Sequence, residues 1–250
     1  MAYKHIGRDF TPPDIFGKVT GQAKYAEDYR ADGMVFMKTW DSPLPHARVT
    51  NIDASAALAM DGVIAVLTPE EVPEVEDAAE VMLSAEPSYV GEPIVAVAAE
   101  TEQIAADALA KIRVDLEPMP FVMDPLDSLR PDGPNAREGG NAANRGVPLQ
   151  THKWTDGDFQ SGDDGLPTSG SALIDWSFGD VDAGFEKANI VLDETFVTAS
   201  NPHHSMEPRS AMCYWENGKC FVHGSCQSQS FALPSIARML GIEPSDVVFI

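Results

Sequence analysis

Short apolar runs separated by polar or turn-forming residues follow one another along residues 17–127. Runs of this length, one of them with clean alternation of apolar and polar side chains, indicate β-strands. A short helix is expected over 54–60, where it stops before Gly62. The expected strands cover residues 34–40, 47–52, 63–67, 93–98 and 113–116.

A second helix is predicted to begin after Thr101. The threonine is a suitable N-cap, and Glu102 in the first turn suits the helix dipole. Strand–helix–strand order with short links predicts an α+β domain, in which helices cover one face of a layered sheet. The apolar positions of this helix form one stripe, made of Ile104, Ala105, Ala108, Leu109 and Ile112.

Residues 128–175 have a different composition, in which Gly, Asn, Asp, Pro and Ser outnumber aliphatic residues. Such a segment lacks the apolar surface needed for a core of its own. We interpret it as a connector without internal structure over 128–172, which lies on a surface and is anchored by Trp154 and Phe159. The expected organisation is an irregular arm at 1–16, a first domain at 17–127, the connector at 128–175 and a second domain at 176–250.

The regular pattern returns in the second domain. A helix is expected over 181–188, a strand over 189–198, and a hairpin with strands at 211–215 and 220–223. The hairpin turns at Asn217-Gly218, a dipeptide typical of two-residue turns.

The end of the chain combines a helix with a new apolar run. The helix is expected over 231–240, with Pro234 in its first turn and Gly241 after its end. The run at 247–250 predicts a strand, and we expect its partner to come from polypeptide after Ile250 or from a second subunit.

The charge of the chain narrows the classes of partner. The 250 residues include 39 Asp and Glu against 17 Lys and Arg, which gives a formal net charge of −22. Nucleic acid and anionic membranes both require basic residues, so neither is an expected partner. Residues 51–100 contain acidic side chains and no Lys or Arg. They form either a solvated acidic surface or a docking face for a basic partner.

The sequence shows no sign of export. Residues 1–21 contain no apolar signal segment, and no run approaches 18 consecutive apolar residues, so no membrane span is expected. The chain has 3 cysteines, all within 213–226. An odd, clustered set is no disulfide framework and fits a reducing, cytoplasmic location.

Three residues suggest a metal site at first sight, namely His203, His204 and Glu207. The zinc-protease pattern requires Glu directly after the first His and a second His four residues further on, and this pattern is absent. Pro208 also interrupts a continuous ligand helix. We expect a turn that holds the entrance of a strand, and no metal bound by protein side chains.

The hairpin cysteines are a poor ligand set too. With the turn at Asn217-Gly218, Cys213 pairs with Val222, so Cys213 and Cys220 share a face but lie diagonally. We expect them to pack as small apolar residues, with His223 on the opposite face.

The loop at 224–230, Gly-Ser-Cys-Gln-Ser-Gln-Ser, lies between a predicted strand and a predicted helix. A strand-to-helix turn presents free backbone N–H groups, and a glutamine side chain offers both a donor and an acceptor. The candidate binding residues are Ser225, Cys226, Gln227 and Ser228. They would hydrogen-bond an oxo or phosphate group of a large ligand, and ordinary helix capping is the alternative.

A series of motifs in order over nearly the whole chain resembles the large, molybdenum-cofactor subunit of the xanthine dehydrogenase/aldehyde oxidase family of molybdenum hydroxylases. The connector at 128–172 does not match the family pattern. The motifs lie at residues 18–25 with Asp28, at 42–48, 62–68, 91–101 and 206–209, and in the loop at Gln227.

The resemblance implies an α/β hammerhead domain at 17–127 and the beginning of an α+β molybdopterin-binding domain at 176–250. It implies hydroxylation of an aldehyde or an N-heterocycle with water as the oxygen source. Molybdenum would be held by the dithiolene of a molybdopterin, in the cytosine dinucleotide form if the protein is bacterial. Gln227 falls on the family glutamine that hydrogen-bonds near the metal's oxo group. The family's glutamate base falls downstream of Ile250, so no catalytic residue is expected within this chain.

The same resemblance implies partners. Iron–sulfur clusters and FAD are expected on other chains or domains. The partners would be an iron–sulfur small subunit and an FAD medium subunit, or the remainder of the large subunit. The chain alone would then be an incomplete enzyme. Two alternatives stay open: a cofactor-free structural or assembly subunit of such a complex, and an unrelated acidic binding module.

Overall fold

The computed structural model describes residues 4, 6–73, 81–137, 139–144, 147–159, 176–192, 194, 196, 198 and 201–250. The chain divides into two compact units. Residues 35–202 form the first, here called the sheet unit. Residues 1–34 together with 203–250 form the second, here called the cleft unit. The boundaries expected from the sequence, at 16/17, 127/128 and 175/176, stay predictions.

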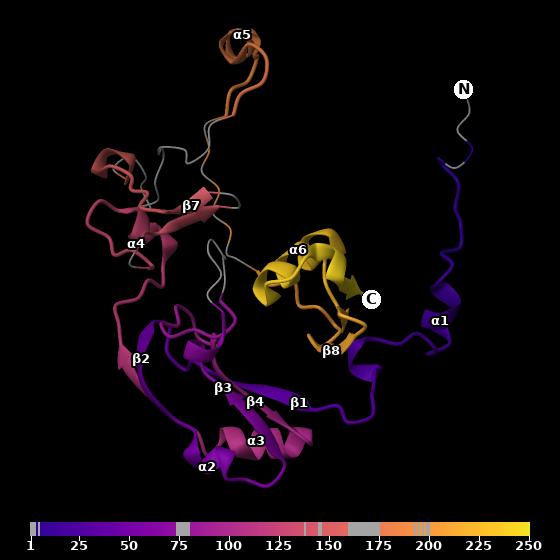
Figure 1. Ribbon diagram of the computed structural model, residues 1–250. Helices are drawn as coiled ribbons and strands as arrows, with labels where there is room; N and C mark the ends of the chain where they lie inside the picture. Colours follow the sequence, from indigo (N-terminus) through magenta and orange to yellow (C-terminus); the bar gives the residue numbers. More distant parts are fainter. Residues whose placement is uncertain are drawn as a thin grey trace. The chain divides into compact units, whose positions relative to one another are not determined.

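A three-stranded antiparallel sheet forms the centre of the sheet unit (Figure 1). Its order is β1 (Phe36–Asp41), β4 (Pro93–Ala99) and β3 (Val63–Leu67). The central strand β4 is apolar throughout, and Ile94, Val95 and Val97 are fully buried in it. A strand with neighbours on both sides and a helix layer on one face is expected to be this uniformly apolar.

Two helices cover one face of this sheet, as predicted. α3 (Glu102–Leu109) packs against β1, β3 and β4, and α2 (Ser55–Leu58) packs against β3 and α3. The Thr101 hydroxyl caps α3, because its oxygen accepts a hydrogen bond from the Ile104 N–H at 3.2 Å. Ala108 and Ile112 complete the buried cluster beneath the sheet.

The remaining two predicted strands form a ladder of their own. β2 (Ala47–Asp53) pairs antiparallel with β5 (Arg113–Pro118), with an irregularity between Val49 and Asn51. All five strands predicted for residues 17–127 are therefore present. The prediction that they form one layered sheet was wrong, because they form a three-stranded sheet and a separate two-stranded sheet.

The predicted connector contains structure of its own, which corrects the expectation for 128–172. Its elements are α4 (Pro125–Leu129), β6 (Ala142–Asn144), β7 (Val147–Gln150) and the 3₁₀ turn η3 (Asp156–Phe159). Polar side chains replace the missing apolar core. The Asn141 amide donates to the carbonyls of Ser128 and His152, and the Lys153 ammonium donates to those of Ser128 and Gly133.

The two predicted anchors contact each other. The rings of Trp154 and Phe159 lie 5.8 Å apart, and the Arg130 guanidinium lies 4.5 Å from the Phe159 centroid. Both aromatic residues thus stabilise the connector internally. Residues 160–175 lie outside the described part of the chain.

The helix predicted over 181–188 is confirmed as α5 (Val181–Lys187), with the Asp180 carboxylate accepting from the Ala183 N–H. The strand predicted over 189–198 is wrong for residues 189–192, 194, 196 and 198, which form no strand. The other residues of that segment lie outside the description. A run of strand-forming residues such as Ile190 and Val191 does not create a strand without a partner edge that shares its hydrogen bonds.

The cleft unit contains a second three-stranded sheet. β8 (Ala211–Glu216) and β9 (Lys219–Gly224) form the predicted hairpin, and β10 (Val247–Phe249) pairs parallel with β9. The terminal apolar run thus has a partner within this chain, contrary to our expectation. The unit also contains α1 (Ile15–Val19), the 3₁₀ turns η1 (Ala26–Asp28) and η4 (Pro244–Asp246), and α6 (Gln229–Leu240).

α6 begins earlier than predicted. Because it starts at Gln229, Pro234 lies inside the helix and not in its first turn. Gly241 ends the helix with φ at 66°, in the left-handed region that glycine adopts readily.

Candidate functional site

A cleft of about 850 Å³ opens within the cleft unit. One wall is the segment that leads into β8, and the other is the loop between β9 and α6. The lining residues are His203, Ser205, Glu207, Arg209, Ser210, Ala211, Ser225, Cys226 and Gln227. The structure therefore brings together the two C-terminal motifs that the sequence singled out separately.

The local fold explains why the loop faces outward. β9 ends at Gly224 and α6 begins at Gln229, so the residues between them belong to neither ladder. Ser228 occupies the N-cap position, where its carbonyl accepts from the N–H groups of Phe231 and Ala232 at 3.2 and 3.0 Å. Its hydroxyl lies 2.9 Å from that of Ser230.

Three of the four predicted binding residues line the cleft, namely Ser225, Cys226 and Gln227, and all three are exposed. Ser228 does not line it and occupies the N-cap position of α6, where its side chain makes no capping hydrogen bond. Within the described residues, no hydrogen bond engages the Gln227 amide, so its donor and acceptor remain available to a ligand.

One cleft residue was missed by the sequence reasoning. The Ser210 hydroxyl is buried and has no hydrogen-bond partner among the described residues. A buried hydroxyl without a hydrogen-bond partner costs free energy. Only its position after the motif at 206–209 could have suggested it, because burial is not visible in the sequence.

The cleft offers hydrogen-bond donors more than metal ligands. Among the described residues, no three His, Cys, Asp or Glu side chains are grouped so that they could hold a metal ion. His203 and Glu207 line the cleft, and Arg209 adds a positive charge. Such a site suits a ligand that brings its own metal.

The hairpin register is as predicted, but only Cys220 packs as a small buried residue, whereas Cys213 is exposed. Trp215 pairs with Cys220 and Cys213 with Val222. Cys220 is buried with Val222 in the core of the unit, and all three cysteines are free thiols. Burial raises the pKa of the Cys220 thiol, and partial desolvation raises the pKa of the exposed Cys213 thiol, so both stay protonated and are poor metal ligands.

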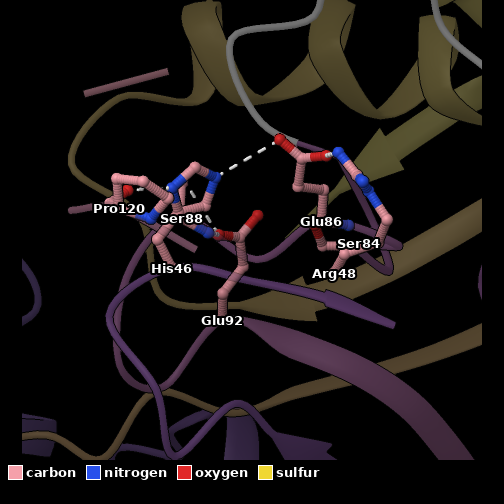
Figure 2. A network of polar contacts seen from close by, with 7 residues as sticks. All are labelled: His46, Arg48, Ser84, Glu86, Ser88, Glu92 and Pro120. Carbon is pink, nitrogen blue, oxygen red and sulfur yellow. Dashed lines mark hydrogen bonds and ion pairs between the residues drawn. The ribbon is translucent and has the colours of Figure 1, made fainter. Parts of the chain in front are cut away.

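A separate polar network lies in the sheet unit (Figure 2). The buried His46 ring contacts the Pro120 carbonyl through Nδ1 at 2.5 Å and the Glu86 carboxylate through Nε2 at 3.2 Å. Arg48 also pairs with Glu86, at 3.3 Å. Both partners of the ring are acceptors, so the two contacts are simultaneous hydrogen bonds only when both ring nitrogens carry protons. The network connects the start of β2 to the segment after β5, and we interpret it as structural.

Comparison with protein families identifies the class. Residues 20–120 match the a/b hammerhead domain of aldehyde oxidase and xanthine dehydrogenase, and residues 166–250 match the molybdopterin cofactor-binding domain. The chain belongs to the xanthine dehydrogenase/aldehyde oxidase family, as the large, molybdopterin-binding subunit or a part of it. The predicted fold class, a hammerhead domain followed by the start of a molybdopterin-binding domain, is confirmed.

Individual relatives agree. The chain is 28% identical to the nicotinate dehydrogenase large molybdopterin subunit of Eubacterium barkeri, over 98% of this chain and 53% of the relative. It is 31% identical to a probable xanthine dehydrogenase subunit of Bacillus subtilis, over 84% of this chain and 25% of the relative. The chain thus spans at most about half the length of these relatives.

Solved structures share the fold. Quinoline 2-oxidoreductase from Pseudomonas putida 86 superposes with a TM-score of 0.70 at 21% identity, over 99% of this chain and 30% of that one. The aldehyde oxidoreductase of Desulfovibrio gigas superposes with a TM-score of 0.69 at 23% identity, over 95% of this chain and 26% of that one.

No helix among the described residues is long and apolar enough to cross a membrane.

Proposed function

We propose that this chain supplies the hammerhead domain and one wall of the cofactor site to a molybdenum hydroxylase. The enzyme would hydroxylate an aldehyde or an N-heterocycle, with water as the oxygen source. The observation that supports this most directly is the cleft itself. Its unpaired donors at Ser210 and Gln227 lie within or beside a segment that matches a molybdopterin-binding domain.

The residues of the cleft fit a pterin-bound metal. When bound, molybdopterin supplies the redox-active molybdenum, so the protein needs hydrogen bonds and shape more than metal ligands. The Gln227 amide can orient an oxo group as donor or a protonated oxygen as acceptor. Ser225 adds a hydroxyl on the same wall, and Arg209 adds a positive charge suited to the phosphate of such a cofactor.

The finer features of the assembly belong to the same proposal. The cofactor would be the cytosine dinucleotide form of molybdopterin, and electrons would leave through iron–sulfur clusters and FAD on partner chains. The general base would be a glutamate outside residues 1–250. The protein would act in the cytoplasm, where its three free thiols persist in reduced form.

The decisive test is Gln227→Ala in the assembled enzyme. Loss of one hydrogen bond to a strongly polar group costs roughly 1.5–3 kcal/mol, so kcat should fall about 10- to 150-fold. Molybdenum and pterin content should change little, because one side chain contributes a small share of cofactor binding.

The matched control is Gln229→Ala, which removes the next glutamine but not one that lines the cleft. It should retain the parental kcat. Equal rates for Gln227→Ala and the parent enzyme would contradict the assignment of the loop. Absence of molybdenum and pterin from the native complex would favour the cofactor-free structural subunit instead.

A further inference from the structure

Four aromatic rings follow one another across the outer face of the hairpin in the cleft unit. Tyr29 lies on His223 with ring centroids 4.1 Å apart. His223 is followed by Tyr214 at 5.9 Å and Tyr214 by Phe221 at 5.0 Å, with the last two rings nearly parallel. The first ring comes from the N-terminal part of the chain and the other three from β8 and β9.

The turn that carries Tyr29 is organised by polar contacts. The Tyr25 N–H donates to the Asp28 carboxylate at 3.0 Å, which closes η1, and η1 packs against β8. The Arg30 guanidinium then donates to the backbone carbonyl of Tyr29 at 2.7 Å. The tyrosine ring is thus presented to the hairpin by a preformed turn.

His223 is buried near the end of β9. Its side chain is 8% exposed, and Nδ1 is buried without a hydrogen-bond partner among the described residues. The backbone here belongs to the ladder with β8, in which His223 pairs with Met212 and Gly224 with Ala211, and the Gly224 N–H also donates to the Ile250 carbonyl at 3.4 Å. The ring contact with Tyr29 therefore adds a side-chain restraint to a strand end that the ladder with β8 already holds.

The end of β9 is also the start of the cleft loop. Ser225, Cys226 and Gln227 follow directly, are exposed, and have no side-chain hydrogen bond within the described part of the chain. The position of such a loop is determined by the residues on either side of it. One flank is the N-cap of α6, and the other is His223 under the Tyr29 ring.

We propose that Tyr29 is a positioning residue for the cleft. By stacking on His223 it holds the end of β9, and so places the Gln227 amide at a fixed position in the cleft wall. The inference rests on the proposed function for its catalytic consequence. Its structural part, the restraint of residues 224–228, stands independently.

The test compares three variants in the assembled enzyme. Tyr29→Leu removes the ring, and Tyr29→Phe keeps it. Tyr25→Leu is the control: it makes the same tyrosine-to-leucine substitution in the same turn, at a residue outside the row of ring contacts. Amide hydrogen exchange of residues 224–228, with and without cofactor, should be roughly 3- to 10-fold faster in Tyr29→Leu. Tyr29→Phe and Tyr25→Leu should exchange at the parental rate.

Turnover gives the second readout. In Tyr29→Leu, kcat should fall about 3- to 10-fold with KM and molybdenum content unchanged, and Tyr29→Phe should restore it. The Tyr29→Leu/Gln227→Ala double variant should be no slower than Gln227→Ala alone, because the tyrosine acts through the glutamine.

The outcomes separate this inference from the proposed function. Parental exchange in Tyr29→Leu overturns the restraint, whatever Gln227→Ala does. Fast exchange with parental kcat, while Gln227→Ala is slow, overturns the positioning role and leaves the function intact. A parental rate in Gln227→Ala overturns the role proposed for the loop, and the exchange data still decide the restraint. Loss of folding in both Tyr29→Leu and Tyr29→Phe assigns the tyrosine a structural role and rejects the inference.

Discussion

The central sheet of the sheet unit and the sheet of the cleft unit are each built from three strands, yet they bury very different interiors. β4 in the sheet unit has a strand on both sides and a helix layer on one face, and Ile94, Val95 and Val97 are completely buried. In the cleft unit the buried cluster consists of Cys220, Val222, Ala237 and Val247, which are small residues. The first interior is large enough to fix a fold by burial, whereas the second is modest.

The difference follows what each sheet carries. In the sheet unit, polar side chains form hydrogen bonds within the unit, such as the contacts of His46 with Pro120 and Glu86. In the cleft unit the exposed Gln227 amide lines the cleft without a hydrogen-bond partner among the described residues, and the Ser210 hydroxyl is buried without one. Stability and binding capacity are thus concentrated in different parts of the chain, a common separation between scaffold and site.

The strongest test of this contrast is a matched pair of core truncations. Ile94→Ala removes a fully buried side chain and should lower the free energy of unfolding of the sheet unit by about 2–5 kcal/mol. Ile236→Ala removes a partly buried one from α6 and should cost the cleft unit about 1–2 kcal/mol. Denaturant unfolding followed by hydrogen exchange in each unit measures both. Equal costs would mean that the two interiors are equally well packed.

A polar substitution in the sheet unit is the next test. His46→Leu leaves the Pro120 carbonyl and the Glu86 carboxylate without the ring as partner, and should cost roughly 1–3 kcal/mol. His203→Leu is the control, because this histidine is exposed and a surface change of this kind stays within about 0.5 kcal/mol. Thermal unfolding of both variants compares them. A stable His46→Leu variant would show that apolar packing alone holds the scaffold.

The same contrast explains what the sequence could predict. Strands in the sheet unit were recognisable because burial imposes uniform apolar runs, and α3 because Thr101 caps a regular stripe. The hairpin was predicted in register because Asn217 and Gly218 both adopt positive φ, at 51° and 78°, as a two-residue turn requires. These features depend on residues that are close together in the sequence, so the sequence alone can predict them.

The errors arose where distant residues decide the outcome. Residues 189–198 contain apolar and β-branched side chains typical of strands, but the described ones form no strand. The connector was expected to lack structure, yet Asn141 and Lys153 fold it through carbonyls far from them in sequence. In the site, the loop at 225–227 could be identified from its composition. The buried Ser210 hydroxyl and the contact between Tyr29 and His223 could not, because both depend on tertiary packing.

The smallest expected effect concerns the exposed ladder between β2 and β5. The Asn51 amide donates to the Asp115 carboxylate at 3.1 Å and the Arg113 guanidinium at 2.9 Å, and these hydrogen bonds lower the pKa of Asp115 below its usual value of 3.8. A lowered pKa means that the folded state binds fewer protons than the unfolded state in this range. The resulting stability is fully present above about pH 4 and is lost as the pH falls through the lowered value.

Asn51→Ala removes the first of these donors and should raise the pKa of Asp115 towards 3.8. Thr50→Val is the matched control on the same strand, because the Thr50 hydroxyl donates to the backbone carbonyl of Asp115 and not to its carboxylate. NMR titration of the Asp115 side-chain carboxyl carbon measures both variants. An Asp115 pKa that rises equally in the two would mean that the ladder as a whole, and not the amide of Asn51, sets the value. Since the side chains are solvent-exposed, the shift should be visible in the titration while thermal unfolding at pH 7 stays close to that of the parent, in contrast to the loss caused by Ile94→Ala in the buried sheet.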